Sequence, residues 1–118
     1  IIHVSVTGKQ DTQKKREFME FAANSIRSHT NTLPKNIYVY FREMEPENVR
    51  KTAPTALIDW TMIPDRTNEA KKAIMGELTD ELAKLTGENG SEIAIIFNDI
   101  PLPNAVLGGI TRADNYNW

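Results

Sequence analysis

Three side chains with chemical potential alternate along one stretch of the chain: Tyr38, Tyr40 and Arg42. The surrounding residues alternate as in a strand, where side chains two residues apart point to the same face. We therefore expect two phenols and one guanidinium on a single surface, a set that can orient a carbonyl group and hold a carboxylate. The same set would equally suit an interface in which the phenols bridge subunits.

The composition excludes several other chemistries. The 118 residues suit one domain, and they include no cysteine, so disulfides and thiolate nucleophiles are excluded. His3 and His29 are each isolated from a second metal ligand, and we predict neither a metal nor a cofactor. The formal net charge of -2 gives no broad basic surface, so we expect no nucleic-acid partner, and any anion site must be local.

The start of the chain is too short and too polar to be a signal peptide. No apolar run in the sequence approaches membrane-spanning length. We therefore expect a cytoplasmic protein without a membrane partner.

The first half of the chain has the pattern of a strand, a helix and a second strand. Apolar residues alternate over positions 2–7, and a helical pattern follows from Thr12, with Asp11 or Thr12 as its N-cap. The apolar stripe of this helix consists of Phe18, Phe21, Ala22, Ser25 and Ile26. After a turn, positions 37–42 alternate again and predict the second strand.

The second half repeats this order. An apolar run at 56–62 predicts a strand, Thr67 is placed to cap a helix, and Gly87 is placed to end it. The apolar stripe of this helix consists of Ile74, Met75, Leu78, Leu82 and Leu85. Positions 93–97 predict the fourth strand.

The two halves are an internal duplication, because positions 37–43 read IYVYFRE and positions 93–99 read IAIIFND. We divide the chain into a first β-α-β unit at 1–54 and a second at 55–118 that ends in a hairpin at Gly108-Gly109. Right-handed crossovers then predict an α+β fold with a four-stranded mixed sheet and two helices on one face.

The uncovered face of this sheet is expected to be apolar. The side chains predicted to point there are Tyr38, Tyr40, Leu57, Ile63 and Ile96. A surface of this kind favours a symmetric oligomer in which other subunits cover it. The alternative is a one-sided sheet with scattered exposed apolar groups.

The order of these elements and several short motifs resemble the tautomerase superfamily. The chain opens with Ile-Ile-x-Val and carries Gly-Gly after its last strand. The second unit, from Asp65-Arg66-Thr67 to Gly108-Gly109, looks like a 4-oxalocrotonate tautomerase subunit and like the first half of the cis-3-chloroacrylic acid dehalogenases. Positions 36–44 are similar to the second half of those dehalogenases and of macrophage migration inhibitory factor.

The resemblance implies a homotrimer with pockets between subunits, in which a free N-terminal proline moves a proton on an enol or unsaturated oxo acid. Here the chain begins with Ile1, and the matching position of the second unit, about Ala56, is internal, where an amide nitrogen is not basic. At most one catalytic amine per chain follows. Two possibilities stay open: a proline precedes Ile1, or the Ile1 α-amine itself is the base.

The resemblance also implies roles for side chains. Arg66 matches the arginine that holds the substrate carboxylate, and Lys9 takes that place in the first unit as a point charge. Tyr40 matches an active-site tyrosine of the dehalogenases, and Tyr38 a pocket tyrosine of the migration inhibitory factor. Arg112 lies beyond the hairpin, where it can reach a pocket. Each of these cations could instead be a solvated surface charge.

Two observations limit the kind of reaction and the number of active pockets that we expect. The dehalogenases carry a water-activating carboxylate where this chain has Lys51, and a histidine where it has Leu82, so tautomerisation is favoured over hydrolytic dehalogenation. The fourth strand lacks the polar set of the second, so one pocket per chain should dominate. The sequence thus predicts a tautomerase acting on a small-molecule carboxylate, or alternatively a non-catalytic oligomer of this fold that binds carboxylates.

Overall fold

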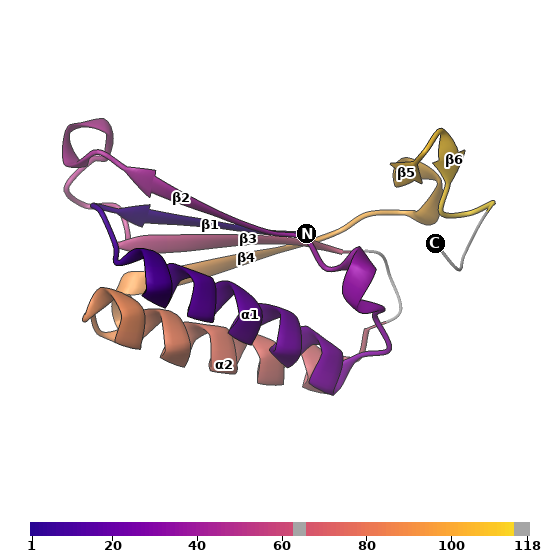
Figure 1. Ribbon diagram of the computed structural model, residues 1–118, viewed down its shortest axis with the longest axis horizontal. Helices are drawn as coiled ribbons and strands as arrows, with labels where there is room; N and C mark the ends of the chain where they lie inside the picture. Colours follow the sequence, from indigo (N-terminus) through magenta and orange to yellow (C-terminus); the bar gives the residue numbers. More distant parts are fainter. Residues whose placement is uncertain (63–65, 115–118) are drawn as a thin grey trace.

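A four-stranded sheet covered on one face by two helices forms the body of the protein in the computed structural model, which describes residues 1–62 and 66–114 (Figure 1). The strands are β1 (Ile2–Thr7), β2 (Val39–Met44), β3 (Ala56–Met62) and β4 (Ile93–Asp99). Their order is β2-β1-β3-β4: each outer strand is parallel to its neighbour, and the central pair is antiparallel. The predicted mixed sheet with two helices on one face is confirmed.

Local capping groups set where the helices begin. Helix α1 (Thr12–His29) begins after Asp11, whose Oδ1 accepts a hydrogen bond from the Lys14 backbone N–H at 3.0 Å. Helix α2 (Asn68–Thr86) begins after Thr67, whose Oγ1 accepts from the Ala70 N–H at 3.1 Å. It ends at Gly87, which has the left-handed φ of 73° that glycine adopts without strain.

The core lies between the sheet and the helices. Alternate residues of the two central strands are buried because the pleat directs them toward the helix layer. They meet the apolar stripes of α1 and α2, as the helical spacing predicts. The buried hydrophobic residues are Ile2, Val4, Val6, Phe18, Ala22, Ile26, Ala56, Ile58, Trp60, Met62, Ile74, Leu78 and Leu82.

The internal repeat has a spacing of 56 residues, read from the two N-caps, Asp11 and Thr67. An ion pair between the first turn or two of each helix and the end of the following strand recurs at the same spacing. These pairs are Lys15–Glu43 at 2.7 Å and Lys71–Asp99 at 3.8 Å. The two units therefore share local packing as well as topology.

The outer strands differ from the prediction at their ends. Strand β2 begins at Val39 instead of position 37, because Pro34–Asn36 form a 3-10 turn (η1) and the Ile37 N–H bonds to the Pro34 carbonyl at 3.2 Å. The Ile37 amide is therefore unavailable to the sheet. Strand β4 continues to Asp99, two residues beyond its predicted end. Three further 3-10 turns are η2 (Pro46–Asn48), η3 (Gly90–Glu92) and η4 (Leu102–Asn104).

A small hairpin follows β4 and projects beyond the end of the sheet (Figure 1). It consists of β5 (Val106–Leu107) and β6 (Ile110–Thr111), joined by Gly108 and Gly109 with φ of 61° and 81°. Positive φ at both turn positions is the geometry of a tight type I′ hairpin. It leaves apolar side chains exposed on both of its strands.

The face of the sheet opposite the helices carries exposed apolar groups. Of the five residues predicted to lie there, two are exposed. Tyr40 is 56% exposed and Ile96 is 49% exposed, whereas Leu57 and Tyr38 are partly buried. Ile63 lies outside the described residues. Neither α1 nor α2 has the apolar length that a membrane-spanning helix requires.

Candidate functional site

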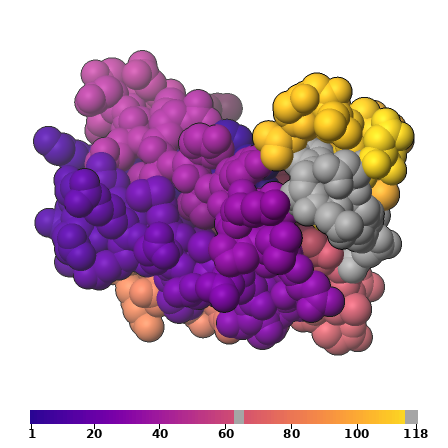
Figure 2. Space-filling view, turned by 45° about the vertical axis from the view of Figure 1, so that its right-hand side comes forward, coloured from indigo at the N-terminus to yellow at the C-terminus, as the bar shows by residue number. Residues whose placement is uncertain are grey.

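A cavity of about 600 Å³ lies at the end of the sheet where β1 begins and β3 ends. The antiparallel pairing of these strands creates it, because it places the start of the chain beside the end of β3. Ile1 N donates to the Thr61 carbonyl at 2.8 Å, and Thr61 N donates to the Ile1 carbonyl at 2.8 Å. In Figure 2 the loop after α1 and the C-terminal hairpin both lie at this end of the molecule.

The lining of the cavity combines apolar surface with cationic and neutral polar groups. The apolar part is supplied by Ile1, Ile26, Leu33, Ile37, Trp60, Met62, Ile100, Ala105, Val106 and Leu107. The polar side chains are those of Asn31, Thr32, Asn36, Tyr38, Thr61, Arg66, Asn104 and Arg112. The described lining thus contains two arginines and no carboxylate. An anion with an apolar part is the ligand that suits such a surface.

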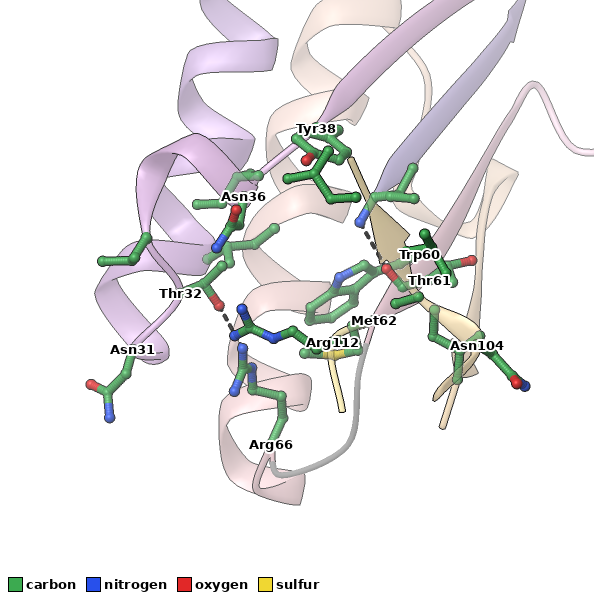
Figure 3. Close-up of a pocket in the computed structure, with 18 residues that line it drawn as sticks. Asn31, Thr32, Asn36, Tyr38, Trp60, Thr61, Met62, Arg66, Asn104 and Arg112 are labelled. Carbon is green, nitrogen blue, oxygen red and sulfur yellow. Dashed lines mark hydrogen bonds between the residues drawn. The ribbon is translucent and has the colours of Figure 1, made fainter. Parts of the chain in front are cut away.

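Arg66 lines this cavity and is half-buried, just before α2. Its Nη2 donates a hydrogen bond to the Thr32 Oγ1 at 2.7 Å (Figure 3). Its Nε is buried and has no hydrogen-bond partner within the described residues. It also forms no ion pair with any carboxylate in residues 1–62 or 66–114. The guanidinium charge therefore remains available to an anion.

Arg112 reaches the same cavity from the C-terminal hairpin. Its backbone N–H donates to the Ala105 carbonyl at 2.7 Å, which fixes the chain direction after β6. Its side chain is half-buried among the lining residues, and in Figure 3 the side chains of Arg66 and Arg112 converge on one part of the cavity. Two elements far apart in sequence thus contribute cations to one site.

The terminal amine of Ile1 belongs to this cavity as well. Removal from water disfavours the charged ammonium form, and burial lowers the pKa of the Ile1 amine below its ordinary value of 8.0. A larger fraction of this amine is consequently neutral near pH 7. Only the neutral amine has a lone pair that can accept a proton.

The three polar side chains of the predicted second strand do not all lie at the cavity. Tyr38 precedes β2 and lines the cavity. Tyr40 lies on the outer face, where its ring stacks on His3 with centroids 5.0 Å apart and planes 14° apart. Arg42 is exposed farther along β2, opposite Ser5. Tyr40 and Arg42 share the outer face of β2, and neither lines the cavity, so one chain does not bring all three groups into one pocket.

Lys9 lies at the opposite end of the sheet from the cavity, and the repeat spacing makes Gln10, not Lys9, the counterpart of Arg66. Next to it, Glu43 accepts hydrogen bonds from the Lys15 ammonium at 2.7 Å and from the Gln10 backbone N–H. These two bonds lower the pKa of Glu43 and hold it ionised. This end therefore carries an internal ion pair.

Sequence reasoning missed the polar wall of the cavity, which is formed by Asn31, Thr32, Asn36 and Asn104. The first three belong to the polar segment 28–36, which resembles an ordinary connecting loop. Its position directly after a helix stripe gives no signal of a ligand. Within the described ranges, no group of three histidine or acidic side chains could hold a metal ion.

The fold and the site together define a protein of two fused β-α-β units with a cation-lined cavity beside the first strand. The family model described as Tautomerase enzyme matches residues 57–114, which is the second unit. No curated protein sequence matches the chain significantly.

Solved structures match the whole chain at low identity. A fused 4-OT wild-type symmetric trimer has a TM-score of 0.87, 21% identity, and coverage of 95% of this chain and 98% of that one. A protein inactivated by 2-oxo-3-pentynoate has a TM-score of 0.86, 20% identity and coverage of 95% and 96%. A member of the cis-3-chloroacrylic acid dehalogenase family has a TM-score of 0.81 and 16% identity, with coverage of 93% of this chain and 81% of that one. The second unit therefore matches the tautomerase family, and the chain as a whole has the fold of the fused, two-unit 4-OT structures.

Proposed function

We propose that the protein is a tautomerase-type isomerase of small enols or unsaturated oxo acids, in which an amine at the start of β1 is the general base. The observation that carries this proposal is the shared cavity: an amine of lowered pKa lies in one lining with Arg66, Arg112 and Tyr38. The tautomerase-family fold by itself suggests isomerase-type activity.

The proposed reaction moves one proton and changes nothing else. Arg66 and Arg112 bind the carboxylate, and the Tyr38 phenol donates a hydrogen bond to the carbonyl oxygen. The lone pair of the neutral amine takes a proton from the carbon next to the carbonyl, and the amine becomes an ammonium. The electron pair of the broken C–H bond forms the enolate. The ammonium then gives the proton to a different carbon, which shifts the double bond and regenerates the amine.

Two amines can fill the role of the base. If Ile1 is the terminus, its own amine is the base. If a proline precedes Ile1, the Ile1 nitrogen becomes an amide that keeps its bond to Thr61, and the antiparallel register places the added residue opposite Met62, which also lines the cavity. Both forms put a basic nitrogen beside the same cations.

The active form is proposed to be a homotrimer. Support comes from the exposed apolar side chains of the hairpin, Val106 at 57%, Leu107 at 48% and Ile110 at 50%, together with those on the outer face of the sheet. A fused 4-OT of the same fold is a symmetric trimer. In such an assembly Tyr40, Arg42 and Lys9 of one chain can approach the cavity of another.

Covalent labelling tests the base. The compound 2-oxo-3-pentynoate inactivates one protein of this fold. It carries a carboxylate and an alkyne conjugated to a carbonyl, so a neutral amine can add to the alkyne. We expect one label per chain, located by peptide mapping on the N-terminal residue. The labelling rate should rise with pH and level off at a lower pH than for an ordinary α-amine, because the pKa of this amine is lowered.

Matched variants separate the base from the carboxylate site. An acetylated N-terminus should take no label, whereas Arg66→Ala should label about ten- to a hundredfold more slowly, since one charge-assisted contact is lost. Arg16→Ala, at an exposed position of α1 that does not line the cavity, is the control for removal of a surface arginine. A label on a lysine, or none, would favour the carboxylate-binding protein without catalysis.

A further inference from the structure

Arg66 is the end of a chain of hydrogen bonds that runs into α1. Its Nη2 bonds to the Thr32 hydroxyl at 2.7 Å, and that hydroxyl lies 2.8 Å from the Thr30 hydroxyl. The Thr30 hydroxyl in turn lies 2.7 Å from the Ile26 carbonyl oxygen, in the last turn of α1. The Thr32 backbone N–H also bonds to the Thr30 oxygen, at 3.3 Å. Three side chains thus connect the cavity to a helix end.

The direction of every proton in this chain is determined by its two ends. A carbonyl oxygen can only accept, so the single proton of the Thr30 hydroxyl points to Ile26. Thr30 must then accept from Thr32, whose proton is thereby used. A guanidinium can only donate, so Arg66 bonds to a lone pair of Thr32. The dipoles align from the cation to the carbonyl end of α1, which carries partial negative charge.

The second unit repeats only the bond from the threonine hydroxyl to the helix carbonyl. At the repeat spacing, Thr86 corresponds to Thr30, and its hydroxyl donates to the Leu82 carbonyl at 2.9 Å. Glu88, whose N–H bonds to the Thr86 hydroxyl oxygen at 3.4 Å, stands where the first unit has Thr32. The bond from threonine to the helix carbonyl is therefore a shared helix-ending device. The extension through Thr32 to an arginine accompanies the cavity.

We propose that Thr32, supported by Thr30, is a positioning residue that holds the Arg66 guanidinium in the orientation that binds the substrate carboxylate. This inference rests on the proposed function of the cavity. Thr32 does not contact the ligand through its proton, because that proton is committed to Thr30. It acts by fixing one edge of a long, flexible side chain before the ligand arrives, which removes part of the ordering cost of binding.

Titration with fumarate tests the proposal without requiring catalysis. We expect Thr32→Val, which keeps the shape and removes the hydroxyl, to weaken binding about three- to tenfold. Thr32→Ser, which keeps the hydroxyl, should bind within about twofold of the parent. Thr86→Val is the matched control, because it makes the same change at the corresponding helix end of the other unit, and it should leave binding unchanged. Thermal melts confirm that all variants fold.

The double variant that combines Thr32→Val with Arg66→Ala gives the decisive comparison. In the Arg66→Ala background, Thr32→Val should have no further effect on binding, because the group that it positions is gone. Normal binding by Thr32→Val beside weakened binding by Arg66→Ala would overturn the positioning role and leave the proposed function intact. Parent-like binding by Arg66→Ala would overturn both.

Failure of the parent to bind fumarate would count against the proposed function. In that case NMR spectroscopy tests the positioning role of Thr32 without a ligand. The Arg66 guanidinium should show slowed rotation about its Cζ–Nη2 bond in nitrogen NMR spectra of the parent and of Thr32→Ser. This rotation should be fast in Thr32→Val. Equal rotation rates in all three proteins would overturn the positioning role independently of any ligand.

Discussion

Replacing Glu77 with alanine tests how the two helices are held together. Glu77 lies on α2, and its Oε2 accepts from the Ser25 hydroxyl of α1 at 2.7 Å and from His29 Nε2 at 2.9 Å. Ser25 is only 5% exposed, so its hydroxyl depends on a protein partner. The Glu77 carboxylate therefore links α1 to α2 by hydrogen bonds, and Glu77→Ala should lower the free energy of unfolding.

The size of this loss follows from the burial of each partner. Leaving a buried hydroxyl without its partner costs about 1 to 3 kcal/mol. The Ser25 hydroxyl can rotate toward a carbonyl of its own helix, which favours the lower part of that range. The His29 side chain is 31% exposed and that of Glu77 is 43% exposed. The contact between these two exposed side chains adds at most about 0.5 kcal/mol. We expect a total loss of about 1 to 2 kcal/mol.

Denaturant unfolding at one fixed protomer concentration measures this loss, because stability of an oligomer depends on concentration. Glu81→Ala is the control, since it makes the same change on the same helix and removes only an exposed contact with Lys84 at 3.7 Å. A double-mutant cycle with Ser25→Ala should show coupling of about 1 kcal/mol. Equal losses for Glu77→Ala and Glu81→Ala, together with zero coupling, would refute the reasoning.

The pH dependence of this contribution has a definite sign. The hydrogen bond from Ser25, and then that from His29, lower the pKa of Glu77 below its ordinary value of 4.5. A carboxylate with a lowered pKa stabilises the fold at pH values above 4.5, and this stabilisation is lost as the pH falls through the folded-state pKa. The difference between the parent and Glu77→Ala should therefore shrink at acid pH. A difference that grows toward low pH would contradict this account.

Three further changes test the core, the hairpin and a helix cap. Leu78→Ala should destabilise the protein by about 2 to 5 kcal/mol in urea unfolding, because Leu78 is fully buried, whereas the partly buried Leu85→Ala should cost less. Gly109→Ala should destabilise the hairpin by about 1 to 2 kcal/mol, since its φ is 81°, and sedimentation should show a weaker oligomer. Asp11→Ala should lower stability by about 1 kcal/mol, and Asp11→Asn should restore most of it in thermal melts.

Local patterns in the sequence were sufficient to predict most elements of this fold. The apolar stripes, the N-caps Asp11 and Thr67 and the stop at Gly87 each depend on residues within one or two helical turns, so the sequence determines them without knowledge of the tertiary structure. The duplication predicted the topology for the same reason, because each unit repeats one local order. The ends of β2 were less predictable, since they depend on how a neighbouring 3-10 turn uses its amides.

The composition of the site depends instead on contacts between distant segments. Only the antiparallel pairing of β1 with β3 brings Ile1 beside Thr61 and thus into one cavity with Arg66, and no periodicity specifies which strands pair. The tyrosines are divided by the same geometry, because Tyr38 lies at the end of the sheet beside the cavity, whereas Tyr40 lies farther along β2 and stacks on His3. The sequence therefore determined the parts of the protein that neighbouring residues decide, and the tertiary structure determined which of its charged and polar groups meet.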